Sequence, residues 1–217
     1  MTRRAVRSIL LPVAALFALA VWPAEAYAQR YAYLVRDCIS ACVGQQLLIF
    51  DAATGSAVTQ VQLAVDGNGQ PTAVAGTKHL AISPEGRRAY VTFDQRIVVV
   101  NLETNTVLGQ FSGVQAPSYP VLSSDGQRLY VLDQPNANSY AVVVLNTATG
   151  TATTYPMTGI SGASDLSVTA DESTAVVRTS TGLAAMAFGT GAVRSLAMGT
   201  LTDVILHPDG QRAFTLT

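Results

Sequence analysis

The chain contains 217 residues, of which 49% are hydrophobic and only 12% are charged, and its net charge is −1. This composition excludes intrinsic disorder, which requires low hydrophobicity together with high charge. The near balance of 13 basic and 14 acidic residues argues against a nucleic-acid-binding protein, because such proteins carry a basic excess.

The first 28 residues have the pattern of a secretory signal peptide. Three arginines lie within the first seven residues, residues 9–22 form an apolar stretch, and Ala26 and Ala28 supply the small-x-small pattern that signal peptidase needs. The apolar stretch is shorter than the roughly 20 residues of a membrane-spanning helix, although a retained membrane anchor is the alternative. We expect Sec-dependent export, cleavage after Ala28, and a periplasmic or secreted mature protein without a membrane span.

Cys38 and Cys42 are the only cysteines of the chain. In an oxidising compartment, two cysteines four residues apart indicate a local disulfide, and the alternative is a redox or metal-binding pair. A metal site needs more ligands, and the two histidines, His79 and His207, lie far away in the sequence without ligand-like spacing. We therefore expect a disulfide between Cys38 and Cys42 that stiffens a loop, and no metal site.

Two short motifs recur along residues 31–217. The first is a Pro-Asp-Gly-type turn followed by an apolar stretch, with clear copies at 83–91, 123–131 and 207–215 and a weaker copy at 169–177. The second has the pattern Asp/Asn-x-x-Thr-Gly/Asn and occurs at 51–55, 101–105 and 146–150, with a degenerate copy at 187–191. Successive copies lie about 40 to 50 residues apart, and such a period with several strands per unit is typical of a β-propeller.

The residue types in both motifs favour strands joined by tight turns. In the first motif, proline presets φ and glycine supplies a positive φ, so we expect a positive φ at Gly86 and Gly126. In the second motif, the first side chain closes an Asx turn and the last residue accepts the left-handed conformation of a hairpin. The apolar stretches at 97–100 and 141–145 do not alternate with polar residues, which indicates strands buried on both faces. Aromatic residues that fall on the second strands of their units are expected in the core: Tyr31, Tyr33, Tyr90, Tyr130 and Phe214.

The sequence therefore predicts an all-β protein, a β-propeller built of four-stranded antiparallel blades. The expected organisation is a signal peptide at 1–28 and propeller repeats at 29–217, with blades at about 31–63, 79–111, 119–156 and 166–197 and a partial fifth at 203–217. Three interpretations of this count remain open: a truncated chain, a compact four-bladed ring, and an open arc that pairs with a partner. An open arc exposes strand edges and apolar faces, which predicts self-association.

The strand Ala-Tyr-Val-Thr at 89–92 resembles the YVTN-repeat family of β-propellers, named after a Tyr-Val-Thr-Asn strand, although Phe93 stands in place of the final Asn. The resemblance covers residues 31–217 and implies a secreted or periplasmic propeller. It also implies that the chain is incomplete at its C-terminus, since members of the family usually have more blades. Relatives include lactonases and the large subunits of amine dehydrogenases, but none of their catalytic motifs matches this chain. We therefore predict no catalytic, cofactor-binding or metal-binding residues and no cofactor.

The two regular turns of each blade are expected at one end, whereas the loops at the opposite end vary in length and sequence. This arrangement is typical of a scaffold that carries a recognition surface on its irregular end. Three aspartates follow second strands at that end and are candidate ligand-binding residues of the rim: Asp37, Asp94 and Asp133. The alternative is that they are ordinary turn-forming residues.

The predicted function is that of an exported β-propeller acting as a binding or interaction scaffold. Its expected partner is a protein or small-molecule ligand at the loop rim, and not a nucleic acid. The alternative is a periplasmic propeller enzyme or enzyme subunit, similar to a lactonase or to the large subunit of an amine dehydrogenase. The lack of a matching catalytic motif favours the scaffold.

Overall fold

The structure is a computed structural model of the chain and describes residues 31–36, 45–64, 79–93, 95–207 and 212–216. These residues form seventeen β-strands in five antiparallel sheets, and no helix occurs among them. The described part of the chain accordingly offers no helical segment that is long and apolar enough to cross a membrane.

Within every sheet, the strands are arranged side by side in their order along the chain. The first sheet contains β1 (Tyr31–Arg36), β2 (Gln46–Asp51) and β3 (Ala57–Gln62). Three four-stranded sheets follow: β4 (Leu80–Ile82), β5 (Arg88–Phe93), β6 (Arg96–Asn101) and β7 (Thr106–Phe111); β8 (Ser118–Leu122), β9 (Arg128–Asn136), β10 (Ser139–Asn146) and β11 (Ala152–Met157); and β12 (Ser164–Val168), β13 (Thr174–Thr179), β14 (Gly182–Ala187) and β15 (Val193–Ala197). The last sheet pairs β16 (Asp203–Leu206) with β17 (Ala213–Leu216).

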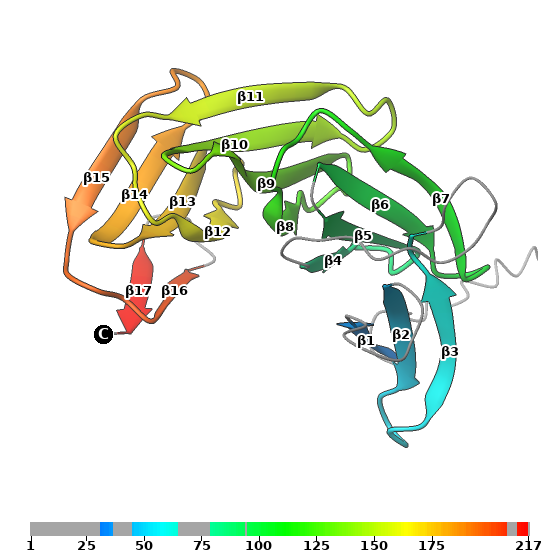
Figure 1. Cartoon of the computed structure of the whole chain (residues 1–217). Helices are drawn as coiled ribbons and strands as arrows, with labels where there is room; N and C mark the ends of the chain where they lie inside the picture. The colour runs from blue at the N-terminus through cyan, green and yellow to red at the C-terminus, as the bar shows by residue number, and fades with distance from the viewer. Residues whose placement is uncertain (1–30, 37–44, 65–78, 94, 208–211, 217) are drawn as a thin grey trace, which may run out of the picture.

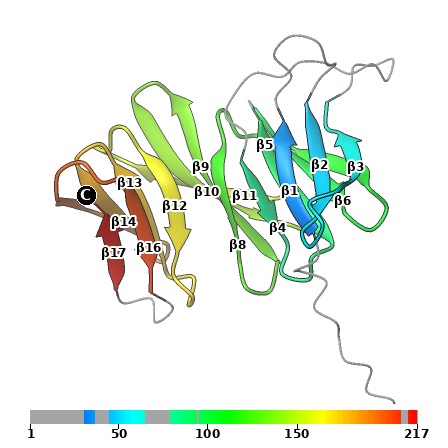
Figure 2. The same cartoon turned by 90° about the horizontal axis from the view of Figure 1, so that it is seen from below.

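The five sheets follow one another along an arc, as Figure 1 shows. The first strand of each four-stranded sheet, β4, β8 or β12, lies on the inner side of the arc together with β16, and the last strand lies on the outer side. Contacts along the inner side join β4 to β8, β8 to β12 and β12 to β16, and Figure 2 shows the sheets standing beside one another. Each sheet is one blade, numbered 1 to 5 in chain order. The expected all-β fold of four-stranded antiparallel blades, about four with a partial one, is confirmed.

The turn before the last strand of a blade has the predicted Asx geometry. Asp51 Oδ1 accepts hydrogen bonds from the amides of Ala53 and Thr54 at 2.9 and 3.0 Å. Asn101 and Asn146 accept the same pair of bonds in the next two copies. The last residue of this turn is left-handed in all four copies, with φ values of +67° at Gly55, +55° at Asn105, +73° at Gly150 and +68° at Gly191.

The turn between the first and second strands begins with a hydroxyl side chain. The hydroxyls of Ser83, Ser123 and Thr169 each accept a hydrogen bond from the amide five residues later, at 2.9 to 3.1 Å. The predicted positive φ is confirmed at Gly86 (+72°) and Gly126 (+69°). In the weaker copy, Glu172 takes the same conformation, with a φ of +56°.

Both turns lie at the same end of each four-stranded blade. In each of these blades, an amide of the second turn donates to a carbonyl of the first at 2.8 to 2.9 Å: Leu102 to Arg87, Thr147 to Gln127, and Phe188 to Ser173. We call this end the turn end. The inner strands therefore begin at the opposite end, which we call the loop end.

The core consists of apolar layers between neighbouring blades. In β6, Val98 and Val100 belong to the cluster shared with blade 1, whereas Ile97 and Val99 belong to the cluster shared with blade 3. Since both faces of the strand are covered, apolar residues are needed at every position, which explains the continuous apolar stretch at 97–100. A third cluster joins blades 3 and 4.

The seam between blades 3 and 4 also contains a polar contact. Tyr130 is 1% exposed and donates its hydroxyl proton to Glu172 Oε2 at 2.5 Å, while Arg128 Nη2 lies 2.8 Å from the same oxygen. Burial, and after it the hydrogen bond to Glu172, raises the pKa of the Tyr130 hydroxyl far above its ordinary value. The phenol therefore stays protonated and keeps Glu172 of one blade bound to its neighbour.

Replacing Tyr130 by phenylalanine should lower the free energy of unfolding by about 2 kcal/mol, because a hydrogen bond to a charged group contributes roughly 1.5–3 kcal/mol. Tyr90 is the matched control, since it occupies the equivalent position of blade 2 and is also 1% exposed. Its hydroxyl forms no hydrogen bond within the described part of the chain. Urea denaturation of Tyr130→Phe and Tyr90→Phe compares the two. If both variants lost the same free energy of unfolding, the hydrogen bond between Tyr130 and Glu172 would contribute nothing to stability.

Candidate functional site

The loop end carries a polar or aromatic residue at the same place of each blade, within the inner strand or directly before it. These residues stand four positions before the residue that opens the first turn, and they are His79, Tyr119, Asp165 and Asp203. Because successive inner strands contact one another, the four residues form a row along the inner side of the arc. We call this row, together with Arg178 near the end of β13, the inner rim.

β-Bulges interrupt two of the inner strands at the rim positions. The pairing of β8 with β9 shifts register at Tyr119, and the pairing of β12 with β13 shifts register at Asp165. Both residues have a left-handed backbone, with φ values of +49° and +61°. For a residue with a side chain this conformation costs about 1–3 kcal/mol, and bulges re-aim side chains beside active sites. A bulge with an energetically unfavourable left-handed residue thus recurs at equivalent positions of neighbouring blades.

His79 and Tyr119 contact one another between blades 2 and 3. Their ring centroids are 4.1 Å apart, and the His79 amide donates to Thr92 Oγ1 at 3.0 Å. Burial lowers the pKa of His79, and the charge of Asp165 partly offsets this effect. The imidazole is therefore neutral at pH 7. Its buried Nδ1 has no hydrogen-bond partner among the described residues.

Asp165 interacts with a cation and with a second carboxylate. Burial raises the pKa of Asp165, the charge of Arg178 lowers it, and the charge of Asp203 raises it again. Arg178 Nη1 donates to the carbonyl of Leu201 at 3.0 Å, whereas its buried Nε is unpaired with respect to the residues that the structure describes. Both Asp165 and Arg178 are half-buried. Hydrogen bonds within the described residues therefore replace only part of the water that these polar side chains lose on folding.

The inner rim therefore offers a neutral imidazole, a phenol, two carboxylates and a guanidinium. Such a mixed set can bind a polar ligand through both donors and acceptors. A His and an Asp with pKa values shifted by burial, close together and half-buried, are typical of functional sites. In the described ranges, no three His, Cys, Asp or Glu side chains lie close enough together to hold a metal ion.

Four of the five residues singled out from the sequence lie outside the described residues. These are the candidate rim ligands Asp37 and Asp94 and the cysteines Cys38 and Cys42. The disulfide and the ligand-binding roles of both aspartates stay predictions.

Asp133 is described and lies in β9 with only 4% of its surface exposed. Its Oδ1 accepts hydrogen bonds from the amides of Gln115 and Ala116 at 3.0 and 2.8 Å. Asp133 therefore holds the loop that leads from blade 2 into Tyr119. A direct contact between Asp133 and a ligand stays a prediction.

None of the inner-rim residues is predicted as a site from the sequence, although a signal for them exists. When the repeats are aligned on the first turn, the position four residues upstream is never aliphatic. Each of these residues is unremarkable by itself. Their common role depends on the bulges, which arise from the pairing of two strands and not from a local motif.

No family model matches the sequence, and neither does any curated protein. The fold is similar to that of hydrazine synthase from Kuenenia stuttgartiensis, with a TM-score of 0.67 and 15% identity over 86% of this chain and 58% of that chain. It is also similar to the β-propeller domain of Cps50 (Swd1) from Myceliophteria thermophila, with a TM-score of 0.58 and 13% identity over 84% of this chain and 57% of that one.

This chain thus spans less than two thirds of either structure. At such low identities, the similarity concerns the fold alone, and the resemblance to the YVTN-repeat family stays a prediction. By its fold, the chain is a β-propeller.

Proposed function

We propose that this chain is an exported binding scaffold that holds a polar ligand, either a protein segment or a small molecule, at the inner rim. The observation that carries the proposal is the left-handed conformation at Tyr119 and Asp165, at equivalent positions of neighbouring blades. Strained residues of this kind cluster at binding and catalytic sites, where function compensates for their cost. The signal-peptide pattern of the first 28 residues supports export.

The charge of Asp165 also supports a role in binding. Its pKa is higher in the folded than in the unfolded chain, so the stability linked to it is present at low pH and is lost as the pH rises through the folded pKa. Asp165→Asn removes this loss, and Asn tolerates a left-handed backbone. We expect the variant to be more stable than the wild type at pH 7 and to lose its advantage below about pH 4. A residue that lowers stability at neutral pH is consistent with selection for a ligand.

A propeller enzyme is the second candidate, and it is favoured by one observation. His79 is neutral at pH 7, and the pKa of the nearby Asp165 carboxyl group is raised. In such a pair, one side chain can act as a general base and the other as a general acid. One of the similar structures reported above is named as an enzyme, hydrazine synthase, and that similarity extends only to the fold.

The two histidines of the chain make a direct test feasible by NMR of the imidazole resonances. His79 belongs to the inner rim, whereas His207 lies at the turn end with its ring centroid 6.0 Å from that of Phe214. Because the charge of Asp165 raises the pKa of His79, Asp165→Asn should lower the titration midpoint of His79. The imidazole resonances of His207, which lies beside Phe214 and not at the inner rim, serve as the internal reference of the spectra.

The same spectra are then recorded with acetate, methylamine, a tripeptide and γ-butyrolactone as probes. A binding scaffold should show saturable shifts of His79 alone, and Asp165→Asn should weaken the binding of that probe about tenfold, which corresponds to the loss of one good charged contact. Turnover of the lactone would instead favour the enzyme. Shifts that affect both histidines equally, or neither, would contradict a ligand site at the inner rim.

A further inference from the structure

The inner rim carries more negative than positive charge. Asp165 and Asp203 contribute two carboxylates, and Arg178 contributes one guanidinium. His79 is neutral at pH 7, because burial lowers its pKa. Among the residues that the structure describes, neither carboxylate forms an ion pair with a basic side chain. The described residues of the rim therefore leave one negative charge unbalanced, and a bound cation would balance it.

The one guanidinium of the rim is already used by the fold. Arg178 Nη1 donates a hydrogen bond to the carbonyl of Leu201 at 3.0 Å, and the Nε of the same side chain is buried. The charge of Arg178 also lowers the pKa of Asp165. A bound anion would compete with the Leu201 carbonyl and the Asp165 carboxylate for this guanidinium, so the rim favours a positive ligand over a negative one.

The two carboxylates of the rim lie close enough to repel one another. The charge of Asp203 raises the pKa of Asp165. Asp203 is exposed, and its Oδ1 accepts a hydrogen bond from the adjacent amide of Val204 at 2.8 Å. Two carboxylates that repel one another are both stabilised by an opposite charge beside them. Their pairing across blades 4 and 5 thus provides a place for a cation.

Aromatic rings border this place on the side of blades 2 and 3. The rings of His79 and Tyr119 have centroids 4.1 Å apart, and both side chains are half-buried. The charge of Asp165 acts on His79, although the two residues belong to blades 4 and 2, so both lie near Tyr119 of the blade between them. Aromatic rings attract cations, and their apolar surface also accommodates an alkyl chain.

We propose, on the basis of the ligand site proposed above, that the inner rim binds an organic cation, namely the protonated amine of a small molecule or of a lysine side chain. The ammonium group donates hydrogen bonds to the carboxylates of Asp165 and Asp203. The carbon chain that carries the ammonium group lies along the rings of His79 and Tyr119.

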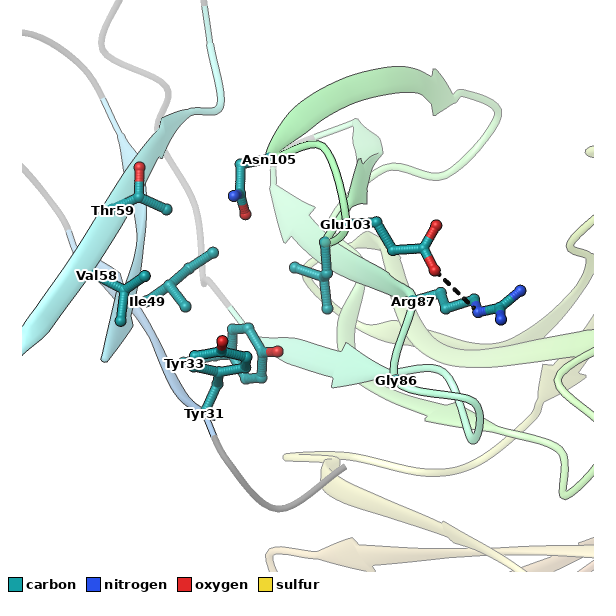
Figure 3. Close-up of a pocket in the computed structure, with 10 residues that line it drawn as sticks. Tyr31, Tyr33, Ile49, Val58, Thr59, Gly86, Arg87, Glu103 and Asn105 are labelled. Atoms are coloured by element: carbon teal, nitrogen blue, oxygen red, sulfur yellow. Dashed lines mark ion pairs between the residues drawn. The ribbon is translucent and has the colours of Figure 1, made fainter. Parts of the chain in front are cut away.

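The cavity between blades 1 and 2 at the turn end provides a contrast to the inner rim. It has a volume of about 430 Å³, and Arg87 and Glu103 are among the residues that line it. Arg87 Nε and Glu103 Oε1 lie 3.1 Å apart, as Figure 3 shows. Because these two charges balance one another, we expect no cation to bind there. Glu103→Gln therefore serves as the matched control variant, since it removes one carboxylate charge away from the inner rim.

Three probes with the same four-carbon chain test the sign of the charge: n-butylammonium, butyrate and butan-1-ol. Each is titrated into the purified protein at pH 7, where the amine is protonated, and the imidazole resonances of His79 are followed by NMR. We expect saturable shifts with butylammonium and at least tenfold weaker binding of the other two probes. Equal or tighter binding of butyrate or butan-1-ol would overturn the cation but leave a ligand site at the inner rim. If none of the three binds, the cation is overturned, and the proposed function falls with it only if its own probes also fail to shift His79.

A pair of variants locates the bound amine. Asp203→Asn should weaken the binding of butylammonium about fivefold, the effect of losing one exposed ion pair. Glu103→Gln should leave this binding unchanged. Circular dichroism of both variants checks that they are folded. Equal effects of the two substitutions on folded protein would show that the amine responds only to the overall charge of the protein, and would overturn the proposal.

A fourth probe distinguishes the two sources of the amine. In Nα-acetyl-lysine-N-methylamide, the side chain carries the only charge. Binding at least as tight as that of butylammonium would identify a lysine of a polypeptide as the ligand, because the flanking amides are then accommodated. Binding at least tenfold weaker than that of butylammonium would identify a small free amine. Both results support a cation at the inner rim and differ only in its source.

Discussion

Replacing Gly182 by alanine is expected to destabilise the protein by about 3 kcal/mol, the largest effect of any single substitution considered. Gly182 opens β14 with a φ of +146° and pairs with Ala197 of β15. A Cβ at this position would stand 2.2 Å from the Leu196 carbonyl oxygen and 2.7 Å from the Met198 amide nitrogen. Both atoms belong to the backbone, so β15 would have to move as a whole.

Gly189 provides the control for this substitution. It lies in the next turn of the same blade without a positive φ, and no atom lies within 4 Å of the place where its Cβ would stand. Gly189→Ala should leave stability unchanged or raise it by up to about 1 kcal/mol, because alanine restricts the unfolded chain. Urea denaturation of both variants measures the difference. A loss below about 1 kcal/mol for Gly182→Ala would mean that β15 does not approach β14 this closely.

Replacing Asp133 by alanine is expected to cost about 2–3 kcal/mol. The substitution removes a buried carboxylate that accepts two backbone amides, and a hydrogen bond to a charged group contributes roughly 1.5–3 kcal/mol. Asp133→Asn keeps an oxygen acceptor in the same place and should lose about half as much. Equal stability of the alanine variant and the wild type would contradict the role of Asp133 in holding the loop.

The same pair of variants separates the structural role of Asp133 from the predicted contact with a ligand. If Asp133 acts only through the loop, binding of a rim probe should fall in proportion to the loss of stability in both variants. If its carboxylate also touches the ligand, Asp133→Asn should weaken binding more than its small loss of stability explains. Titration of the His79 resonance provides the binding measurement.

Much of the fold could be predicted because its signals are local. The Asx turns that begin at Asp51, Asn101 and Asn146, and the positive φ at Gly86 and Gly126, depend on residues within five positions of one another. Their recurrence at a period of about 40 to 50 residues then indicates a repeated sheet, and a repeated sheet of four strands leads to a propeller.

The candidate site could not be predicted in the same way. From the sequence, Asp133 looks like Asp94, because both follow a Tyr-Val strand. Asp133 lies five residues after Arg128, and the residue five positions after the equivalent Arg88 is Phe93, one position before Asp94. Phe93 is fully buried, so Asp133 takes an interior position of its strand, which its likeness to Asp94 in the sequence does not reveal.

The sequence by itself determined the order of the strands, the type of each turn and the apolar character of strands such as β6, because neighbouring residues decide these properties. Only the tertiary structure decided where the bulges fall and which side chains are covered. Tyr90 and Tyr130 are 1% exposed, as expected for core residues, but that expectation is wrong for Phe214, which is 55% exposed. All three lie on the second strand of a blade. Their burial differs because it depends on whether a further strand or blade packs over them, and that contact joins residues far apart in the sequence.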